Sequence, residues 1–233
     1  MKSSLQKIFF AAAFFLVIAS VSCRHKFYTA SNFDELTRNH RKVAILPAEM
    51  IFTGVKPTNM SISDIKKMEE IESTLFQQYL HNSILKYSNA SRHKTDIAFQ
   101  ETKNTLQLLE KNNISIRESW TMNTDELIRI LGVDAVVRMK IQKERYMSDL
   151  ASLGITIGQT VLNQIGRPGS VLTGTHNRTS TIYSSCSLIS DDVVLWNDAY
   201  ERSSDYYTPG RKVVTDITDK FGKNFPYKKK KRN

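Results

Sequence analysis

Three stretches of the chain carry apolar residues at the three- and four-residue spacing of an amphipathic helix. The longest begins near Ser63 and predicts a helix of about 25 residues, whose apolar stripe is Met68, Ile71, Leu75, Phe76, Tyr79, Leu80, Ile84 and Tyr87. A shorter helical stretch around 101–111 turns Leu106 and Leu109 inward. Near the end of the chain, Pro226 ends a helix that is lined by Val213, Val214, Ile217, Phe221 and Phe225.

A fourth helix is marked by signals at both ends, and a strand follows it at once. Asn123 and Glu126 have the spacing of a capping box, and Gly132 suits the left-handed position just past a helix end. The inner face of this helix consists of Leu127, Ile128 and Leu131. The next residues alternate between apolar and polar, which predicts a half-buried strand whose inner face is Ala135, Val137, Met139 and Ile141.

Apolar runs predict further strands. Residues 42–47 form a run that Pro47 ends, as in a buried strand, and a loop containing Gly54 and Pro57 then leads to the long helix. Residues 95–99 predict a short second strand.

A β-hairpin is expected over 179–201. Its first strand has one face formed by Ile182, Ser184, Cys186 and Leu188, and Asp191-Asp192 provides the turn. Because helices and strands are interleaved along the chain, we expect an α/β (α+β) fold with a single mixed sheet and helices packed on it.

Residues 146–178 differ in composition from the rest and form a glycine-rich insert. Five of the nine glycines lie there, and acidic residues almost vanish after Asp149. An alternating strand pattern and a helical face both fit the segment, so periodicity does not decide between them. The insert is either a surface excursion between two strands or a segment that meets a membrane or a neighbouring subunit.

The first 22 residues have the pattern of a signal peptide. Lys2 and Lys7 flank a polar start, and the apolar run 8–19 is shorter than the roughly 20 residues that a membrane-spanning helix needs. Small residues occupy the third and first positions before Cys23, although Ser20 stands where leucine is preferred. The segment resembles a bacterial lipoprotein signal, in which the cysteine is acylated, with palmitate among the chains, and becomes the new amino terminus.

Cys23 is therefore the predicted lipidation site. The alternative is cleavage at the same bond by an ordinary signal peptidase, which leaves Cys23 unmodified. Each buried CH₂ of an acyl chain contributes about 0.8 kcal/mol, so two or three chains make a stable anchor. If Cys23 carries lipid, Cys186 has no partner for an internal disulfide, and its place in an alternating strand predicts a small buried thiol.

These signals divide the chain into four parts. We expect a signal peptide over 1–22, the lipidated cysteine and a polar tether over 23–41, one α/β domain over 42–227, and a basic tail over 228–233.

Most of the net charge of +10 belongs to the ends of the chain. Without the leader and the five basic residues Lys228–Arg232, the charge falls to +3. A nucleic-acid-binding domain would carry a basic face within its fold, so we expect no nucleic-acid partner. The tail is either a solvated terminus or a contact for anionic lipid headgroups, to which each basic residue contributes on the order of 1 kcal/mol.

The sequence contains no motif of a familiar reaction or metal site. Phosphate-binding glycine loops, the G-x-S-x-G and H-E-x-x-H motifs and C-x-x-C pairs are absent, and the five histidines are scattered. Asp134 and Asp198 are the carboxylates best placed for buried polar roles. We therefore expect a protein that is not an enzyme, with no catalytic residue, cofactor or metal.

The order of elements resembles a known family of envelope proteins. The carrying motifs are KVAILP (42–47), ILGVDAVV (130–137) and SLISDDVVLW (187–196). They are similar to envelope lipoproteins with the fold of the TolB amino-terminal domain, among them the periplasmic domain of the curli-secretion lipoprotein CsgG. The match covers roughly 42–225, and Asp191-Asp192 replaces a usual glycine in the hairpin turn.

The resemblance implies a protein-interaction module held at a membrane. We expect a lipoprotein of the bacterial outer membrane, periplasmic or surface-facing, that acts as a non-catalytic subunit of an envelope or secretion assembly. Its partners would be the membrane, through acylated Cys23, and envelope proteins or further copies of itself. The alternative is a CsgG-like oligomeric export channel, for which 146–178 holds one spanning hairpin at most. The interaction candidates are Leu153, Ile155, Ile157, Tyr200, Tyr206 and Tyr207.

Overall fold

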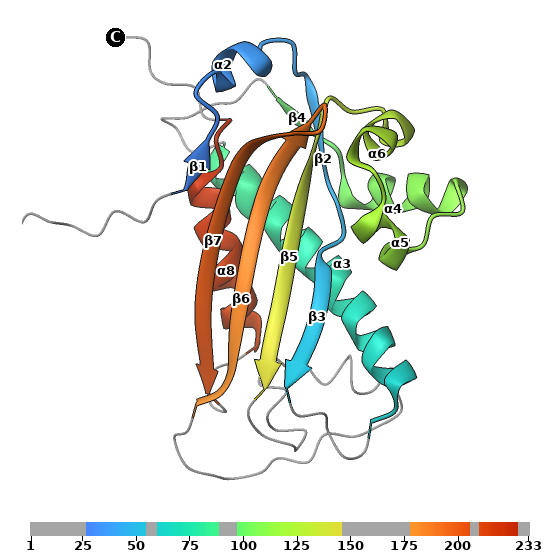
Figure 1. Cartoon of the computed structure of the whole chain (residues 1–233), viewed down its shortest axis with the longest axis vertical. Coiled ribbons are helices and arrows are strands. Elements are labelled where there is room, and N and C mark those ends of the chain that lie inside the picture. Colours follow the sequence, from blue (N-terminus) through green and yellow to red (C-terminus); the bar gives the residue numbers. More distant parts are fainter. Residues whose placement is uncertain (1–26, 55–59, 89–96, 146–177, 206–209, 228–233) are drawn as a thin grey trace, which may run out of the picture.

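Helices and strands alternate along the chain in a computed structural model that describes residues 27–54, 60–88, 97–145, 178–205 and 210–227 (Figure 1). The strands are β1 Tyr28–Thr29, β2 Lys42–Ile45, β3 Glu49–Gly54, β4 Ala98–Phe99, β5 Ala135–Arg145, β6 Arg178–Ser190 and β7 Val193–Asp205. The helices are α2 Phe33–Leu36, α3 Ile62–Ser88, α4 Thr102–Lys111, α5 Ile116–Thr121, α6 Thr124–Leu131 and α8 Gly210–Asn224.

The strands form one seven-stranded mixed sheet in the order β1-β7-β6-β5-β2-β4, and β3 also pairs with β5. On one side of the central strand β5, β6 runs antiparallel, whereas β2 and β3 pair with β5 in parallel, one after the other, on its second side. The β6–β7 hairpin and β1 extend the sheet with antiparallel pairs. The sheet does not close into a barrel, and the predicted class, a single mixed sheet with helices packed on it, is confirmed.

β2 and β3 are two parts of one interrupted strand, and Pro47 lies at the interruption. Ile45 pairs with Val137 and Glu49 with Lys140, so three residues on this side face two on β5. A proline fits such a bulge because it has no amide hydrogen to donate to the ladder. The loop predicted after Pro47 is wrong over 49–54, where the chain instead continues the sheet as β3 and buries Met50.

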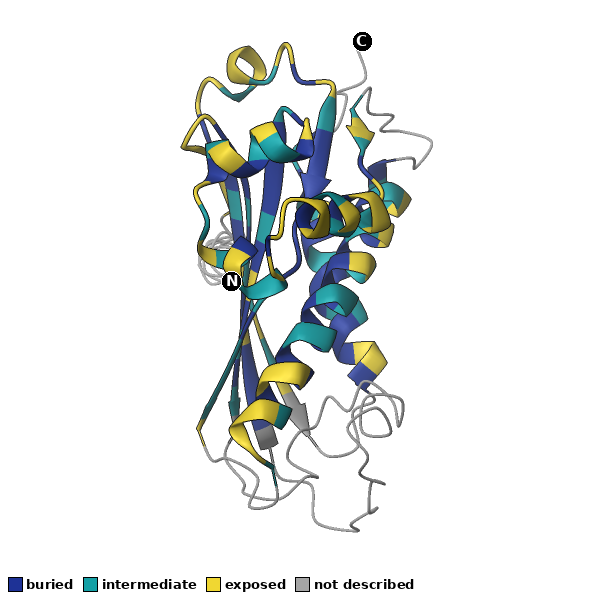
Figure 2. Cartoon of the chain, turned by 90° about the vertical axis from the view of Figure 1, so that its right-hand side faces the viewer, coloured by how far each residue is buried: buried dark blue, intermediate teal, exposed yellow. Residues whose placement is uncertain are grey.

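Helices α3 and α8 cover one face of the sheet and enclose the main hydrophobic core (Figure 1). Both helices contribute fully buried side chains, which are Phe76, Leu80 and Ile84 from α3 and Val213, Val214, Ile217 and Phe221 from α8. The predicted inner face of β5 lies opposite them, with Ala135, Val137, Met139 and Ile141 all buried. Figure 2 shows these layers edge-on. The strands between the helices, such as β2 and the first part of β5, are mostly buried, and the first turn of α3 is exposed.

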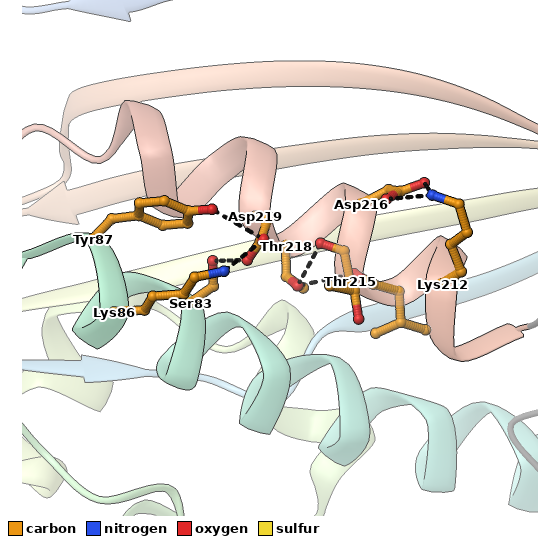
Figure 3. Close-up of polar contacts among 9 residues, drawn as sticks. Ser83, Lys86, Tyr87, Lys212, Thr215, Asp216, Thr218 and Asp219 are labelled. Atoms are coloured by element: carbon orange, nitrogen blue, oxygen red, sulfur yellow. Dashed lines mark hydrogen bonds and ion pairs between the residues drawn. The ribbon is translucent and has the colours of Figure 1, made fainter.

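The two covering helices touch closely at Gly222 of α8. A Cβ atom at Gly222 would lie 2.4 Å from Ser83 Oγ and 2.9 Å from the Ser83 carbonyl carbon, so only glycine permits this approach. One turn earlier on α8, the Asp219 carboxylate accepts hydrogen bonds from the Ser83 hydroxyl at 2.8 Å, the Lys86 ammonium at 3.1 Å and the Tyr87 hydroxyl at 3.0 Å (Figure 3). Burial raises the pKa of Asp219, but these three donors outweigh it and hold the pKa below its usual value.

A second, smaller core lies on the opposite face of the sheet, where α4 and α6 pack on β2 and the start of β5. It buries Ala44 of β2, Leu46 just after β2 and Val136 of β5, together with Leu109, Leu127 and Leu131 from the helices. The predicted ends of α6 are confirmed, since the Asn123 side chain accepts the amides of Asp125 and Glu126, and Gly132 has a φ of 62°.

Helix α5 was not predicted from the sequence. A capping box of Ser115 and Glu118 begins it, and Arg117 pairs with Glu69 and Glu70 of α3. At its other end, the Arg138 guanidinium from β5 donates to three backbone carbonyls, at 3.1 Å and 2.9 Å for Ser119 and Trp120 and also to Met122. Arg138 thus fixes the carboxyl end of α5 to the sheet, because the last carbonyls of a helix have no partner within it.

The turn of the β6–β7 hairpin has left-handed residues at both central positions. Asp191 has a φ of 48° and Asp192 a φ of 54°, which is the geometry of a type I′ turn. The Asp192 amide donates to the Asp125 carboxylate at 3.1 Å and so joins the turn to the start of α6. The hairpin is therefore confirmed, and its turn type, which the sequence left open, follows from these angles.

Candidate functional site

The two faces of the β6–β7 hairpin differ sharply in exposure. On the face under α3 and α8, Ile182, Cys186 and Leu188 are fully buried. On the opposite face, Ser185 and Ser187 are half-buried and Tyr183 keeps 41% of its surface exposed, whereas Thr181 is buried. We define the open face as Lys140 and Gln142 of β5, Tyr183, Ser185 and Ser187 of β6, and Asn197, Ala199 and Glu201 of β7. In Figure 1 it is turned toward the viewer, and no described helix lies over it.

Small and uncharged side chains dominate the open face. Ser187 and Asn197 lie opposite each other on neighbouring strands and share a hydrogen bond of 2.7 Å from the amide to the hydroxyl. Ser185 is opposite Ala199, which places two of the smallest side chains beside Tyr183. At the rim, the Lys140 ammonium pairs with the Glu49 carboxylate at 3.0 Å. These eight residues include one aromatic side chain and no cluster of catalytic groups.

The open face continues onto β1, the strand by which the described chain begins. Tyr28 pairs with Asn197 in the antiparallel register and is 54% exposed, and the Ala30 amide donates to the Leu195 carbonyl at 2.9 Å. Residues 27–41, which the sequence analysis assigned to the tether, therefore carry β1 and α2 and pack on the body. Ala30 and His40, both within that range, are buried.

The covered face holds Cys186 and Asp198, the cysteine and one of the two carboxylates that the sequence indicates for buried roles. Cys186 is fully buried opposite Asp198, and burial raises the pKa of the thiol well above its usual value. A protonated, inaccessible thiol is a poor nucleophile, as expected of a buried structural cysteine. The Asp198 carboxylate accepts a hydrogen bond of 2.7 Å from Asn224, which joins β7 to the end of α8.

Asp134 has a structural role at the start of β5. Its carboxylate accepts the backbone amides of Arg41 and Lys42 at 2.7 Å and 2.8 Å and so fixes the entry into β2. Burial raises the pKa of Asp134, but the two amides, together with the charges of the nearby His40 and Arg41 side chains, lower the pKa overall. Both carboxylates thus hold elements of the fold together.

Of the predicted interaction residues, the structure describes Tyr200 alone. Tyr200 is half-buried and packs against the main core on the covered face, so it does not belong to the open face. The other interaction residues and the predicted lipidation site lie outside the described residues and are Cys23, Leu153, Ile155, Ile157, Tyr206 and Tyr207. The aromatic residues that the structure does expose near the open face, Tyr28 and Tyr183, were not singled out from the sequence.

A buried charge pair was also missed. Lys143 of β5 and Glu72 of α3 face each other on the covered side at 3.6 Å, with 1% and 2% of their side chains exposed. The Lys143 ammonium also lies 5.1 Å from the centre of the Phe52 ring. The position of Lys143 after Ile141 in the alternating strand is the signal that it faces inward.

The described ranges contain neither a metal-ligand cluster nor a helix suited to span a membrane. No group of three or more His, Cys, Asp or Glu side chains there is placed to hold a metal ion. None of the helices in these ranges combines the length and the apolar character needed to cross a membrane.

No protein-family model and no curated protein matches the sequence. Solved structures similar to this chain include the PelC dodecamer from Paraburkholderia phytofirmans, with a TM-score of 0.39 and 12% identity over 79% of this chain and 86% of that one. Lipoprotein GNA1162 from Neisseria meningitidis gives a TM-score of 0.41 and 9% identity over 77% and 94%. The LpoB C-terminal domain from Salmonella enterica gives 0.32 and 5% identity over 73% and 91%. Likeness this partial carries no argument about function, and the resemblance to TolB and CsgG stays a prediction.

Proposed function

We propose that this protein is a lipid-anchored, non-catalytic interaction subunit of a bacterial envelope assembly, and that it binds a protein partner through the open face. Acylated Cys23 would hold it at the membrane. The observation that carries the proposal is the open face itself, beside the strand by which the chain enters the fold.

Exposure of a sheet face is not enough for this argument, because antiparallel sheets often keep one polar face in water. Composition adds the second reason. Of the eight residues that define the open face, two are charged, and Tyr183 lies among serines and an alanine. The cores of protein–protein interfaces are depleted in charged residues, and also in serine and alanine, and are enriched in tyrosine, so Tyr183 and the low charge are the features of the open face that favour a contact. Tyrosine also supplies a large contact area while its hydroxyl still forms hydrogen bonds.

The proposed anchor is close in sequence to a strand that borders the proposed contact surface. Tyr28 of β1, which pairs with Asn197 at the edge of the open face, is five residues from Cys23 in the sequence. A partner that binds this face would therefore meet the protein near the membrane.

A crosslinking experiment in cells tests the contact surface. A photoreactive residue replaces Ala199, which is exposed on the open face, or Gln78, an exposed residue on α3 that serves as the matched control. We expect one discrete crosslinked species from position 199 and none from position 78. Crosslinks between two copies of the chain would identify self-association as the use of this face. The absence of any species from position 199, or equal species from both positions, would contradict the proposal.

The anchor needs a separate test. Cys23→Ser removes the acylated thiol, and we expect it to move the protein from the membrane fraction to the soluble fraction. Cys186→Ser is the control, because that thiol is buried and is not proposed to carry lipid. An unchanged membrane fraction for Cys23→Ser would reject the lipid anchor.

A further inference from the structure

The two sides of the sheet end in edges that are closed to different degrees. On the side of β3, helix α3 accepts hydrogen bonds from the edge. The Ala48 amide, just before β3, donates to the Ser73 carbonyl of α3 at 3.3 Å. The Phe52 amide donates to the Glu69 carboxylate of α3, also at 3.3 Å. Helix α3 thus occupies positions that a further strand would need at this edge.

The opposite edge of the sheet is formed by β7, the outermost long strand in Figure 1. Within the described residues, β1 is the only strand that pairs with its outer side, and the pairing covers Trp196 and Asn197. β7 continues to Asp205, and its pairing with β6 has no register shift between Trp196 and Ser204. A regular strand edge therefore extends beyond the end of β1.

The contact with β1 shows which backbone groups of β7 face outward. The Ala30 amide donates to the Leu195 carbonyl at 2.9 Å, so this carbonyl points away from β6. In an antiparallel ladder, the amides and carbonyls of every second residue point to the same side of the strand. The backbone groups of Ala199, Glu201 and Ser203 therefore point outward as well, and the side chains of all three residues are exposed.

The edge beyond β1 lacks common devices that prevent the pairing of a further strand. Such edges are often protected by proline, lysine or a bulge. Residues 198–205 include no proline or lysine, and their pairing with β6 is regular. Arg202 points to the covered face, where it pairs with Asp216 at 3.1 Å. Glu201 is then the charged side chain that an added strand would meet, and opposite charges on neighbouring strands attract each other.

We propose that the outer edge of β7 beyond β1 binds an extended segment of the protein partner as an added strand, with a basic side chain of that segment opposite Glu201. Backbone hydrogen bonds to Ala199, Glu201 and Ser203 would supply the affinity, as in other cases of strand addition. The inference rests on the proposed function and names how the partner binds. Ala199 and Glu201 belong both to this edge and to the open face, and Tyr183 lies opposite Glu201 on β6.

The crosslinked complex from position 199 provides the first test. Amide hydrogen exchange is measured residue by residue in the purified complex and in the lipoprotein alone, by mass spectrometry with electron-transfer fragmentation. We expect the Glu201 and Ser203 amides to exchange about tenfold more slowly in the complex. The Tyr200 and Arg202 amides point toward β6 in both forms, so they are internal controls and should exchange equally.

The outcomes of this test separate the two proposals. Equal exchange of the Glu201 and Ser203 amides in both forms would overturn strand addition, while the crosslink itself would still support a contact at the open face. The absence of any crosslinked species would reject the proposed function and this inference together. A crosslinked complex of two copies of this chain would overturn the assignment of the edge to a different protein.

A second experiment tests the charge of the bound segment. Glu201→Arg reverses the charge at the edge, and we expect it to reduce crosslinking from position 199 by about fivefold. Glu201→Gln removes the charge at nearly constant size and should give a smaller reduction. Glu110→Arg, the same reversal at an exposed position of α4, is the matched control and should leave crosslinking unchanged. Equal crosslinking in the Glu201→Arg and Glu110→Arg variants would overturn the basic side chain opposite Glu201.

Discussion

The covered face and the open face of the sheet are formed by alternate residues of the same strands, yet the first is buried in the core and the second is exposed at the surface. Under α3 and α8, side chains such as Ile182 and Cys186 have no contact with water. On the open face, Tyr183 and Ala199 lie at the surface and support little of the core. The comparison teaches that one strand places the residues that stabilise the core and the residues of the proposed contact surface at separate positions, so a substitution should affect one property and leave the other unchanged.

The largest effect is expected at the buried charge pair of the covered face. Glu72→Ala removes the carboxylate that faces Lys143, and loss of one partner of a buried pair costs about 3–5 kcal/mol of folding free energy. Urea denaturation followed by far-UV circular dichroism measures it. The double variant Glu72→Leu with Lys143→Met should recover much of this loss, because it removes both charges. If the single variant is as stable as the parent, the pair does not contribute as described.

Neighbouring residues on β6 separate the two faces directly. Ile182→Ala leaves a cavity in the main core and should cost about 2–4 kcal/mol, whereas Tyr183→Ala should change the free energy of unfolding by less than about 0.5 kcal/mol. Tyr183→Ala should instead reduce the crosslinking from position 199. Similar losses of stability in the two variants would contradict the distinction between the faces.

A smaller loss is expected where the two covering helices touch. Gly222→Ala places a Cβ atom 2.4 Å from Ser83 Oγ and against the Ser83 backbone, and the resulting strain should cost about 1–3 kcal/mol. Alanine is otherwise the better helix former by about 1 kcal/mol, so a destabilised variant would show that packing outweighs helix propensity. Lys223→Ala, at the exposed neighbouring position, is the control and should have little effect. A stabilised Gly222→Ala would contradict the close approach.

The Asp219 network should make the α3–α8 contact sensitive to acid. The pKa of Asp219 is lower in the folded protein than the usual 3.8, so the unfolded chain binds the proton more tightly. The stabilisation is complete above that usual value and is lost as the pH falls through the lower, folded value. Asp219→Asn should cost about 1–2 kcal/mol at pH 7 and flatten the acid limb of the stability curve. An unchanged acid limb would show that the carboxylate is not responsible.

The smallest effect is expected at the turn, which belongs to neither face. Asp192 has a φ of 54°, and glycine adopts this conformation more readily than any other residue. Asp192→Gly should therefore stabilise the protein by about 0.5–1 kcal/mol, measured as a higher Tm, and leave crosslinking from the open face unchanged. A lower Tm would mean that the aspartate side chain contributes more than the turn geometry.

Local patterns in the sequence predicted the elements whose cause is local. The inward face of β5, the stripe on α3 and the caps of α6 at Asn123 and Gly132 all follow from residues close together in the chain. The apolar run and proline of β2 also located that strand correctly.

The missed features depend on contacts between distant residues. The sequence predicts a loop where β3 lies, because Pro47 marks a strand end, and only the pairing with β5 shows that the strand resumes. The Asp219 network joins side chains more than 130 positions apart, for which no spacing rule exists. The alternation of Tyr183 with buried residues could have indicated that β6 has an exposed face. Which face is exposed depends on where the covering helices pack, and the local sequence does not determine this.

The two-residue length of β1 has a mechanical consequence. If the protein has the proposed lipid anchor and binds the proposed partner, a force between the two would enter the body through β1, which pairs with β7 at Tyr28 and Thr29. This short pairing would peel away long before the main core yields. Release of residues 27–41 would lengthen the connection to the membrane by about 50 Å. Under force, the protein would then unfold first at β1 while the rest of the sheet stays folded.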